Sequence, residues 1–170
     1  ILKFTVIGIT ALQFRATAQT FNGNAPNTPT AFTPVHRVVI EERTVTWRGW
    51  VVRGTVFLDS IANKYPNTAI PIAVHNGDPM ANSIYDNGLG ASYGMSFPKL
   101  IVDRSVSGDP ASAFSYYNQY ISKPAYADLA VTYSINASRV ATVKVEAHFA
   151  AAMTGTYNLA VVFTEDNVKG

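Results

Sequence analysis

One short segment of this 170-residue chain, residues 42–54, constrains the fold more than any other. It follows the apolar run at residues 38–40 and reads Glu-Arg-Thr-Val-Thr-Trp-Arg-Gly-Trp-Val-Val-Arg-Gly. A short continuous apolar run is typical of a strand covered on both faces. Apolar residues at helical spacing follow the segment. The pattern predicts a buried strand that ends near an acidic residue, a tight turn around Trp47, and the start of a helix.

This strand, turn and helix resemble the active-site region of thioredoxin-like proteins, where an acid on a buried strand precedes Trp-Cys-X-X-Cys. Six positions are in register with that pattern: Glu42 as the acid, Trp47, Gly49 and Trp50 as its matching residues, and Arg48 and Val51 at the cysteine positions. Dithiol chemistry needs a thiolate nucleophile and a resolving thiol, and the chain contains no cysteine. The segment therefore keeps the fold signal without the usual chemistry.

A second landmark is Phe97-Pro98, which enters the strand predicted over residues 99–104. Thioredoxin-like folds place a cis-proline beside the active-site turn, so the resemblance implies a cis Phe97–Pro98 bond close to the turn at residues 48–51. A cis X-Pro bond is uncommon, which makes this expectation specific. With Pro98 added, the six positions above are expected to form a vestigial active-site turn.

The bulk composition limits the classes of function and the kinds of site that the chain can have. Hydrophobic residues make up 48% of the chain and charged residues 14%, which supports a packed core and argues against disorder. The formal net charge is +2, and no Lys/Arg cluster lies near an aromatic ladder, so nothing points to nucleic acid. Without cysteine there is no disulfide, thiolate zinc site or iron–sulfur cluster, and we expect no cofactor.

Periodicity predicts an α/β domain over residues 35–124. The expected elements are a strand at 38–40, a helix at 51–65, a strand at 69–74 with Pro71 at an edge or start, a helical turn about 78–85, a strand at 99–104, and a helix opened by Asp109-Pro110 that runs to about 121. We expect the 38–43 and 99–104 strands to share one mixed sheet, with the 51–65 helix packed on it.

Period-two alternation then predicts a three-stranded antiparallel meander in residues 125–170, an incomplete β-sandwich. The alternating sets are residues 129–134, 140–147 and 157–163, with turns at 136–138 and 153–155. Three such strands are barely self-sufficient. The chain opens on Ile1 and stops shortly after the third set, so we expect this region to be truncated.

Residues 1–34 leave two interpretations open. Lys3, the mostly apolar run at 4–14 and Ala16-Thr17-Ala18 resemble a secretory signal. Alternatively, the alternation of Leu2, Phe4 and Val6 predicts a strand. The apolar run is too short and interrupted to span a bilayer. The Pro-rich stretch at 21–34 predicts an extended lead-in.

The residues of four segments resemble those of one particular protein family. Residues 38–42, the Trp47 turn, residues 73–80 and residues 164–168 resemble the 28-kDa outer-membrane-protein-related family of Bacteroidota. That family joins a signal sequence, a thioredoxin-like domain and a β-rich C-terminal region. The resemblance implies export to the cell envelope or surface, with outer-membrane association. The chain departs from the family's Thr-Gly-Thr-Trp-Cys-Gly-Trp-Cys at three positions, Val45, Arg48 and Val51, and Arg43 stands where an aromatic is usual.

Other candidate sites have structural alternatives. In active thioredoxins the acid at the position of Glu42 accepts a cysteine proton, but without thiols we favour a structural acid paired with Arg43, Arg48 or Arg53. Trp47 and Trp50 either form an interaction surface with the arginines, or Trp47 packs in the core and only Trp50 is exposed.

The three histidines, His36, His75 and His148, fall on different predicted elements, whereas a metal needs convergent ligands. His75 and Asp78 share a loop, but turn chemistry explains Asn-Gly-Asp-Pro without a metal. We therefore expect no metal site.

These observations favour a cell-envelope or surface protein that acts as a binding or assembly module, with a protein partner or a second copy of the chain bound at the Trp47 face or at unpaired strand edges. One alternative is an extracytoplasmic thiol–disulfide oxidoreductase, which requires cysteines at positions 48 and 51. A surface adhesin is a further alternative. As written, the chain has no catalytic cysteine and is not expected to be a dithiol enzyme.

Overall fold

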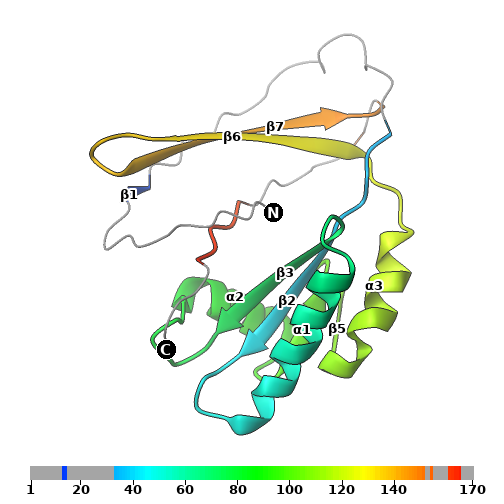
Figure 1. Cartoon of the computed structure of the whole chain (residues 1–170), viewed down its shortest axis with the longest axis vertical. Helices are drawn as coiled ribbons and strands as arrows, with labels where there is room; N and C mark the ends of the chain where they lie inside the picture. The colour runs from blue at the N-terminus through cyan, green and yellow to red at the C-terminus, as the bar shows by residue number, and fades with distance from the viewer. Residues whose placement is uncertain (1–12, 15–32, 152–153, 155–160, 166–170) are drawn as a thin grey trace.

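The computed structural model describes residues 13–14, 33–151, 154 and 161–165. Its α/β part contains, in chain order, β2 (Val38–Thr44), the 3₁₀ helix η1 (Gly49–Val51), α1 (Val52–Lys64), β3 (Ala69–His75), α2 (Ser83–Tyr93), β4 (Lys99–Val102), β5 (Val106–Gly108), the 3₁₀ helix η2 (Pro110–Ser112) and α3 (Ala113–Ile121). A second sheet contains β1 (Gln13–Phe14), β6 (Ala127–Ile135) and β7 (Val140–Phe149). Figure 1 shows the second sheet lying over one end of the α/β part, with the turn after β2 at the other end.

The four-stranded sheet has the order β3-β2-β4-β5. β2 runs parallel to β3 and antiparallel to β4, and β5 is antiparallel to β4. The register sets Ile40 opposite Val102 and Arg43 opposite Lys99, so the prediction that residues 38–43 and 99–104 share one mixed sheet is confirmed. β3 is an edge strand, which accommodates Pro71. This is a thioredoxin-like α/β fold.

Alternation along β2 sends its side chains to two different layers. On one face, α1 and α3 cover a core made of Val38, Ile40, Leu58, Ile61, Ala69, Leu100, Val102, Ala113, Tyr117 and Tyr120. On the other face, Leu89 of α2 packs against Ile72, Val74 and Ile101. Because successive strand residues point to opposite faces, Glu42 is assigned to the α1 side and its neighbours Glu41 and Arg43 to the α2 side.

The predicted helix at 51–65 is confirmed as η1 followed by α1. Gly54, Leu58 and Ile61 are its buried positions, and their spacing is that of one helical face. Lys64 lies in the last turn, where its positive charge interacts favourably with the negative end of the helix dipole. The helix ends before Pro66, as expected from a residue that cannot continue it.

The predicted helical turn at 78–85 is wrong, because a full helix, α2, lies further along the chain at Ser83–Tyr93. Asn82 caps it, its side-chain oxygen accepting a hydrogen bond from the Tyr85 N–H at 3.1 Å. Gly88 and Gly90 hid this helix in the sequence. A Cβ at Gly90 would overlap the Met95 sulfur and lie 3.3 Å from the Arg43 guanidinium, so a larger residue there requires the Met95 side chain to move. The short strand β5 was also not predicted.

Two strands of the predicted meander are present as a hairpin. β6 and β7 pair antiparallel from Ala127–Phe149 to Ile135–Ala141, and the turn is closed by the Asn136 N–H donating to the Val140 carbonyl at 3.1 Å. The predicted third strand falls largely on residues 155–160, outside the described residues, and residues 161–165 form no strand. Of the signal-like or strand segment at 1–18, only residues 13–14 are described, and they pair with β7.

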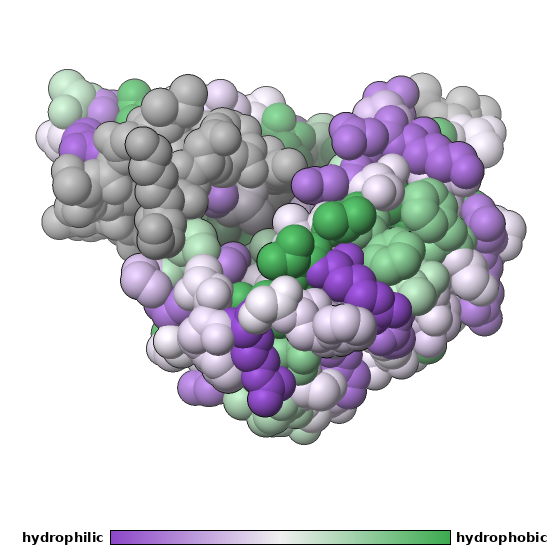
Figure 2. Space-filling model, turned by 60° about the horizontal axis from the view of Figure 1, so that its bottom comes forward, coloured by the Kyte–Doolittle hydropathy of each residue, from purple (hydrophilic) through white to green (hydrophobic). Residues whose placement is uncertain are grey.

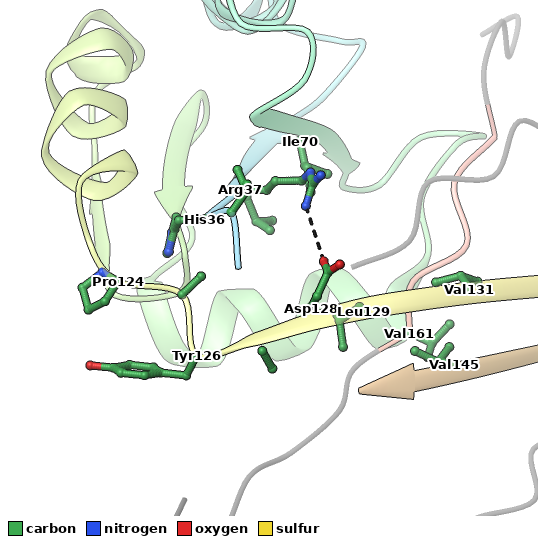
Figure 3. Close-up of a pocket in the computed structure, with 14 residues that line it drawn as sticks. His36, Arg37, Ile70, Pro124, Tyr126, Asp128, Leu129, Val131, Val145 and Val161 are labelled. Carbon is green, nitrogen blue, oxygen red and sulfur yellow. Dashed lines mark ion pairs between the residues drawn. The ribbon is translucent and has the colours of Figure 1, made fainter. Parts of the chain in front are cut away.

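An open pocket of about 580 Å³ separates the hairpin from the α/β part. Figure 3 shows Val131 of β6, Val145 of β7 and Val161 grouped on one side, with Arg37 and Ile70 across from them. The Arg37–Asp128 ion pair that crosses the pocket spans 3.9 Å between exposed groups, so it contributes little. None of the helices in the described part of the chain is both long and apolar enough to cross a membrane.

Candidate functional site

The turn after β2 is held from below by Asp78, which follows β3. One Asp78 oxygen accepts the Thr46 N–H at 3.0 Å and contacts His75 Nδ1 at 2.8 Å, and the other accepts the Met80 N–H at 3.0 Å. Burial alone would raise the pKa of Asp78, but these hydrogen bonds outweigh it and hold the pKa below its ordinary value. Asp78 is therefore charged at neutral pH and anchors the start of the turn.

Trp47 projects from this turn into solvent. Its side chain is 56% exposed, while its indole N–H donates to the Asn76 carbonyl at 3.4 Å. The ring meets Phe97 edge-on, with centroids 6.5 Å apart, and the Arg48 guanidinium lies 5.3 Å from the Trp47 ring centroid. Trp47 is thus fixed along one edge and presents the rest of its surface.

Trp50, on η1, is the more exposed of the two tryptophans at 70%. The Arg53 guanidinium lies 5.6 Å from its ring centroid and donates to both oxygens of Asp109, at 2.8 and 2.6 Å. The alternative in which Trp47 packs in the core and only Trp50 is exposed is therefore wrong. The Thr46 N–H bond to Asp78 and the Trp47 bond to the Asn76 carbonyl hold this part of the turn at the surface.

Figure 2 views this end of the molecule, the lower end of Figure 1. Hydrophobic residues, in green, lie directly beside strongly hydrophilic ones, in purple. Exposed Val52 and Val56 extend the apolar surface along the outer face of α1. Such a mixture of aromatic, aliphatic and arginine side chains is typical of protein interfaces.

Pro98 lies at the inner side of the same turn. The Phe97–Pro98 peptide bond is cis, which confirms the prediction. A Cβ added at Gly54 would lie 3.0 Å from the Pro98 Cβ and would overlap the Glu42 carboxyl group. Glu42 and Pro98 therefore meet at Gly54, with Phe97 against Trp47 on the outside. Residues 48–51 lie on the turn itself, with Val51 buried and Arg48 exposed.

Glu42 is fully buried, and neither of its carboxyl oxygens has a hydrogen-bond partner among the described residues. Desolvation, with a smaller contribution from the nearby Asp59 charge, raises the pKa of Glu42 to about 8, so it is mostly protonated at neutral pH. The expected pairing of Glu42 with Arg43, Arg48 or Arg53 is wrong. Strand alternation turns Arg43 to the opposite face, and the other two guanidinium groups stack on the tryptophans.

Arg43 instead forms a buried ion pair that was not predicted from the sequence. Its Nη2 donates to Asp86 of α2 at 2.5 Å, and both side chains are buried. Arg43 also donates to the Gly94 carbonyl and lies 4.8 Å from the Phe97 ring centroid. Asn76, whose carbonyl holds Trp47, donates its side-chain amide to Asp86. The ion pair thus supports the turn through both Phe97 and Asn76.

A second buried acid, Glu41, lies on the same face. It accepts hydrogen bonds from Tyr85 and from Arg104, the latter at 2.9 Å. Burial raises the pKa of the Tyr85 hydroxyl, and the hydrogen bond to Glu41 raises it further, so the hydroxyl stays protonated. Unlike Glu42, Glu41 is satisfied and has a structural role. Within the described residues, no three His, Asp or Glu side chains gather as a metal site would require.

Comparison with known proteins adds structural likeness only. No known family matches the sequence, and no functionally described protein matches it. Among solved structures, HBP35 of Porphyromonas gingivalis is 18% identical over 59% of this chain and 38% of its own, with a TM-score of 0.49. A protein from Agrobacterium tumefaciens is 14% identical over 62% and 55%, with a TM-score of 0.47. The germline-specific thioredoxin Deadhead of Drosophila melanogaster is 17% identical over 49% and 77%, with a TM-score of 0.37. The chain thus spans 38% and 55% of the first two structures.

Proposed function

We propose that this chain is a cell-envelope protein whose thioredoxin-like domain binds a protein partner through the Trp47 turn instead of exchanging disulfides. The observation that carries the proposal is the exposure of both tryptophans at one turn, with an arginine stacked on each. Tryptophan and arginine are the residue types most enriched at binding hot spots. Exposing two tryptophans costs solvation free energy, which burial against a partner would recover.

We further propose that the chain belongs to the 28-kDa outer-membrane-protein-related family of Bacteroidota and is exported. The four matching segments support this, and two of them, residues 38–42 and 73–80, surround the turn in the folded chain. Thr44, two residues after the first of these segments, accepts a 3.0 Å backbone hydrogen bond from Asn76, which lies within the second. The adhesin interpretation stays a prediction.

Replacing both tryptophans, Trp47→Ala with Trp50→Ala, is expected to weaken capture of the native partner, or self-association, at least tenfold. Truncation at a hot spot of this kind costs more than 1.4 kcal/mol, which is a factor of ten in affinity. Affinity is measured by titrating the partner recovered from the envelope fraction, and self-association by sedimentation of the pure chain. Tyr126→Ala is the matched control, since Tyr126 is equally exposed, at 56%, and lies at the pocket at the other end. If Tyr126→Ala weakens binding and the tryptophan variant does not, the interface lies at the hairpin.

The alternative of a thiol–disulfide oxidoreductase requires cysteines at positions 48 and 51. These positions are Arg and Val in a chain without cysteine, so that alternative is excluded.

The variant Arg48→Cys with Val51→Cys is expected to form an intramolecular disulfide and to reduce insulin, whereas the chain as written does neither. Arg48 is the N-cap of η1 and Val51 is its last residue, which is the spacing of dithiol active sites, and a helix N-terminus stabilises a thiolate. Thiol titration before and after oxidation measures the bond, and insulin turbidity measures the turnover. A variant that keeps two free thiols under oxidising conditions would show that the turn lacks disulfide geometry.

A further inference from the structure

The two arginine–tryptophan pairs of this surface differ in one respect. Arg53 stacks near Trp50, and Asp109 accepts hydrogen bonds from both terminal nitrogens of its guanidinium group. A bidentate pair of this geometry combines charge with directionality. The stacked arginine with its carboxylate is a complete recognition unit that the chain makes with its own residues.

Arg48 and Trp47 form a second arginine–tryptophan pair, without the carboxylate. The Arg48 guanidinium lies 5.3 Å from the Trp47 ring centroid, and it has no acidic partner among the described residues. Two acids that contact the residues around this turn, Asp78 and Glu42, do not pair with it. Asp78 is engaged by the Thr46 N–H and His75, and Glu42 is buried and mostly protonated.

Neighbouring residues hold Trp47 in place on the side that faces the protein. Trp47 is held by the Asn76 carbonyl and by the edge of Phe97, and Phe97 in turn lies over the buried Arg43. The neighbouring residue, Gly49, faces open space, because a Cβ there would meet no atom within 4 Å. A partner can therefore approach Arg48 and Trp47 without rearrangement of the turn, which lowers the entropic cost of binding.

We propose that Arg48, beside the Trp47 ring, binds a carboxylate of an acidic segment of a protein partner, in the manner in which Arg53, beside the Trp50 ring, holds Asp109. This inference rests on the proposed function and specifies its partner. The exposed faces of the two tryptophans receive the apolar residues that flank the acid in the segment. A polyanion such as nucleic acid does not fit, since its binding depends on neutralising several phosphates and only one guanidinium here lacks a described acid.

The test is a display library of random twelve-residue peptides, selected in parallel on the wild-type chain and on Arg48→Gln. On the wild type, we expect selected peptides to be enriched in Asp or Glu next to an apolar residue. On Arg48→Gln that acidic enrichment is lost, because the charge-assisted bonds have no donor. Lys144→Gln removes the same charge on the hairpin and is expected to select the wild-type pool.

The selected peptide is then titrated, as its acid and as the matching Asn or Gln amide. We expect the amide to bind the wild type about tenfold more weakly, and Arg48→Gln to bind both forms equally. Acidic enrichment that persists on Arg48→Gln, or peptides selected without acids, would overturn the acidic assignment. If those peptides still require the tryptophans, the proposed binding surface stands; a pool unchanged by Trp47→Ala with Trp50→Ala would remove that surface too.

Discussion

Replacing Glu42 with glutamine is expected to raise the free energy of unfolding at pH 7 by about 3 kcal/mol. The pKa of Glu42 is about 8 in the folded chain against an ordinary 4.5, so folding at pH 7 must keep a proton on a group that the unfolded chain releases. Each pH unit above the ordinary value costs about 1.4 kcal/mol until the folded pKa is reached. Glutamine has the same shape and no charge, so it removes this cost.

The stability difference between the wild type and Glu42→Gln is expected to depend on pH. Below pH 4.5, Glu42 is protonated in both states, and the wild type and Glu42→Gln are expected to be equally stable. The gap opens as the pH rises from 4.5 to 8 and is constant above 8. Urea unfolding at pH 4.5, 6, 7 and 8.5 measures it. Glu146→Gln is the control, since Glu146 is exposed and its pKa is lowered by Lys144. Two stability curves that run parallel over this range would show that Glu42 is ionised in the fold.

Neutralising Asp86 by Asp86→Asn is expected to cost about 3–5 kcal/mol. The substitution keeps the shape of the side chain and an acceptor for Asn76, but it leaves the Arg43 guanidinium charged and buried without a counterion. Arg43→Met has the same effect in reverse, because it strands the Asp86 carboxylate. Denaturant unfolding of each variant measures the loss.

The double variant, Arg43→Met with Asp86→Asn, is expected to be more stable than either single variant, because no charge is left buried. Losses that simply add would mean that the two side chains do not interact. Removing the exposed Lys144–Glu146 pair is the control and should cost less than about 1 kcal/mol. Since Arg43 lies under Phe97, the fluorescence of Trp47, read in a Trp50→Phe background, is expected to shift in the single variants.

The two experiments address opposite faces of one strand. Glu42 and Arg43 are adjacent in sequence, yet Glu42 is unpaired beneath α1 and Arg43 is fully paired beneath α2. The unpaired acid lowers stability at neutral pH, whereas the paired charges hold Phe97 and Asn76 and, through them, Trp47. The exposed surface that we propose for partner binding thus depends on the buried Arg43 guanidinium. Its counterion, Asp86, lies 43 residues further along the chain.

Local pattern was sufficient for the elements around the turn. Residues 38–40 predicted a buried strand because continuous apolar runs suit a covered sheet, and the spacing of Leu58 and Ile61 predicted α1. The cis Phe97–Pro98 bond was also anticipated, from resemblance to the thioredoxin-like pattern. The same reasoning missed α2, because its glycines are typical of a loop, although Gly90 lies in the helix against Met95 and Arg43.

By itself, the sequence determined that this chain has no thiol chemistry, since composition alone excludes a dithiol site. It also predicted β2, α1, β3, β4 and α3 in their order, because periodicity is a local property, but it predicted neither α2 nor β5. Only the tertiary structure decided which charges are paired and which aromatic rings are exposed. Asp86 became the partner of Arg43 when α2 packed on that face of the sheet, and Asp109 became the partner of Arg53. Ion pairing depends on distances between segments far apart in the chain, and no local pattern encodes them.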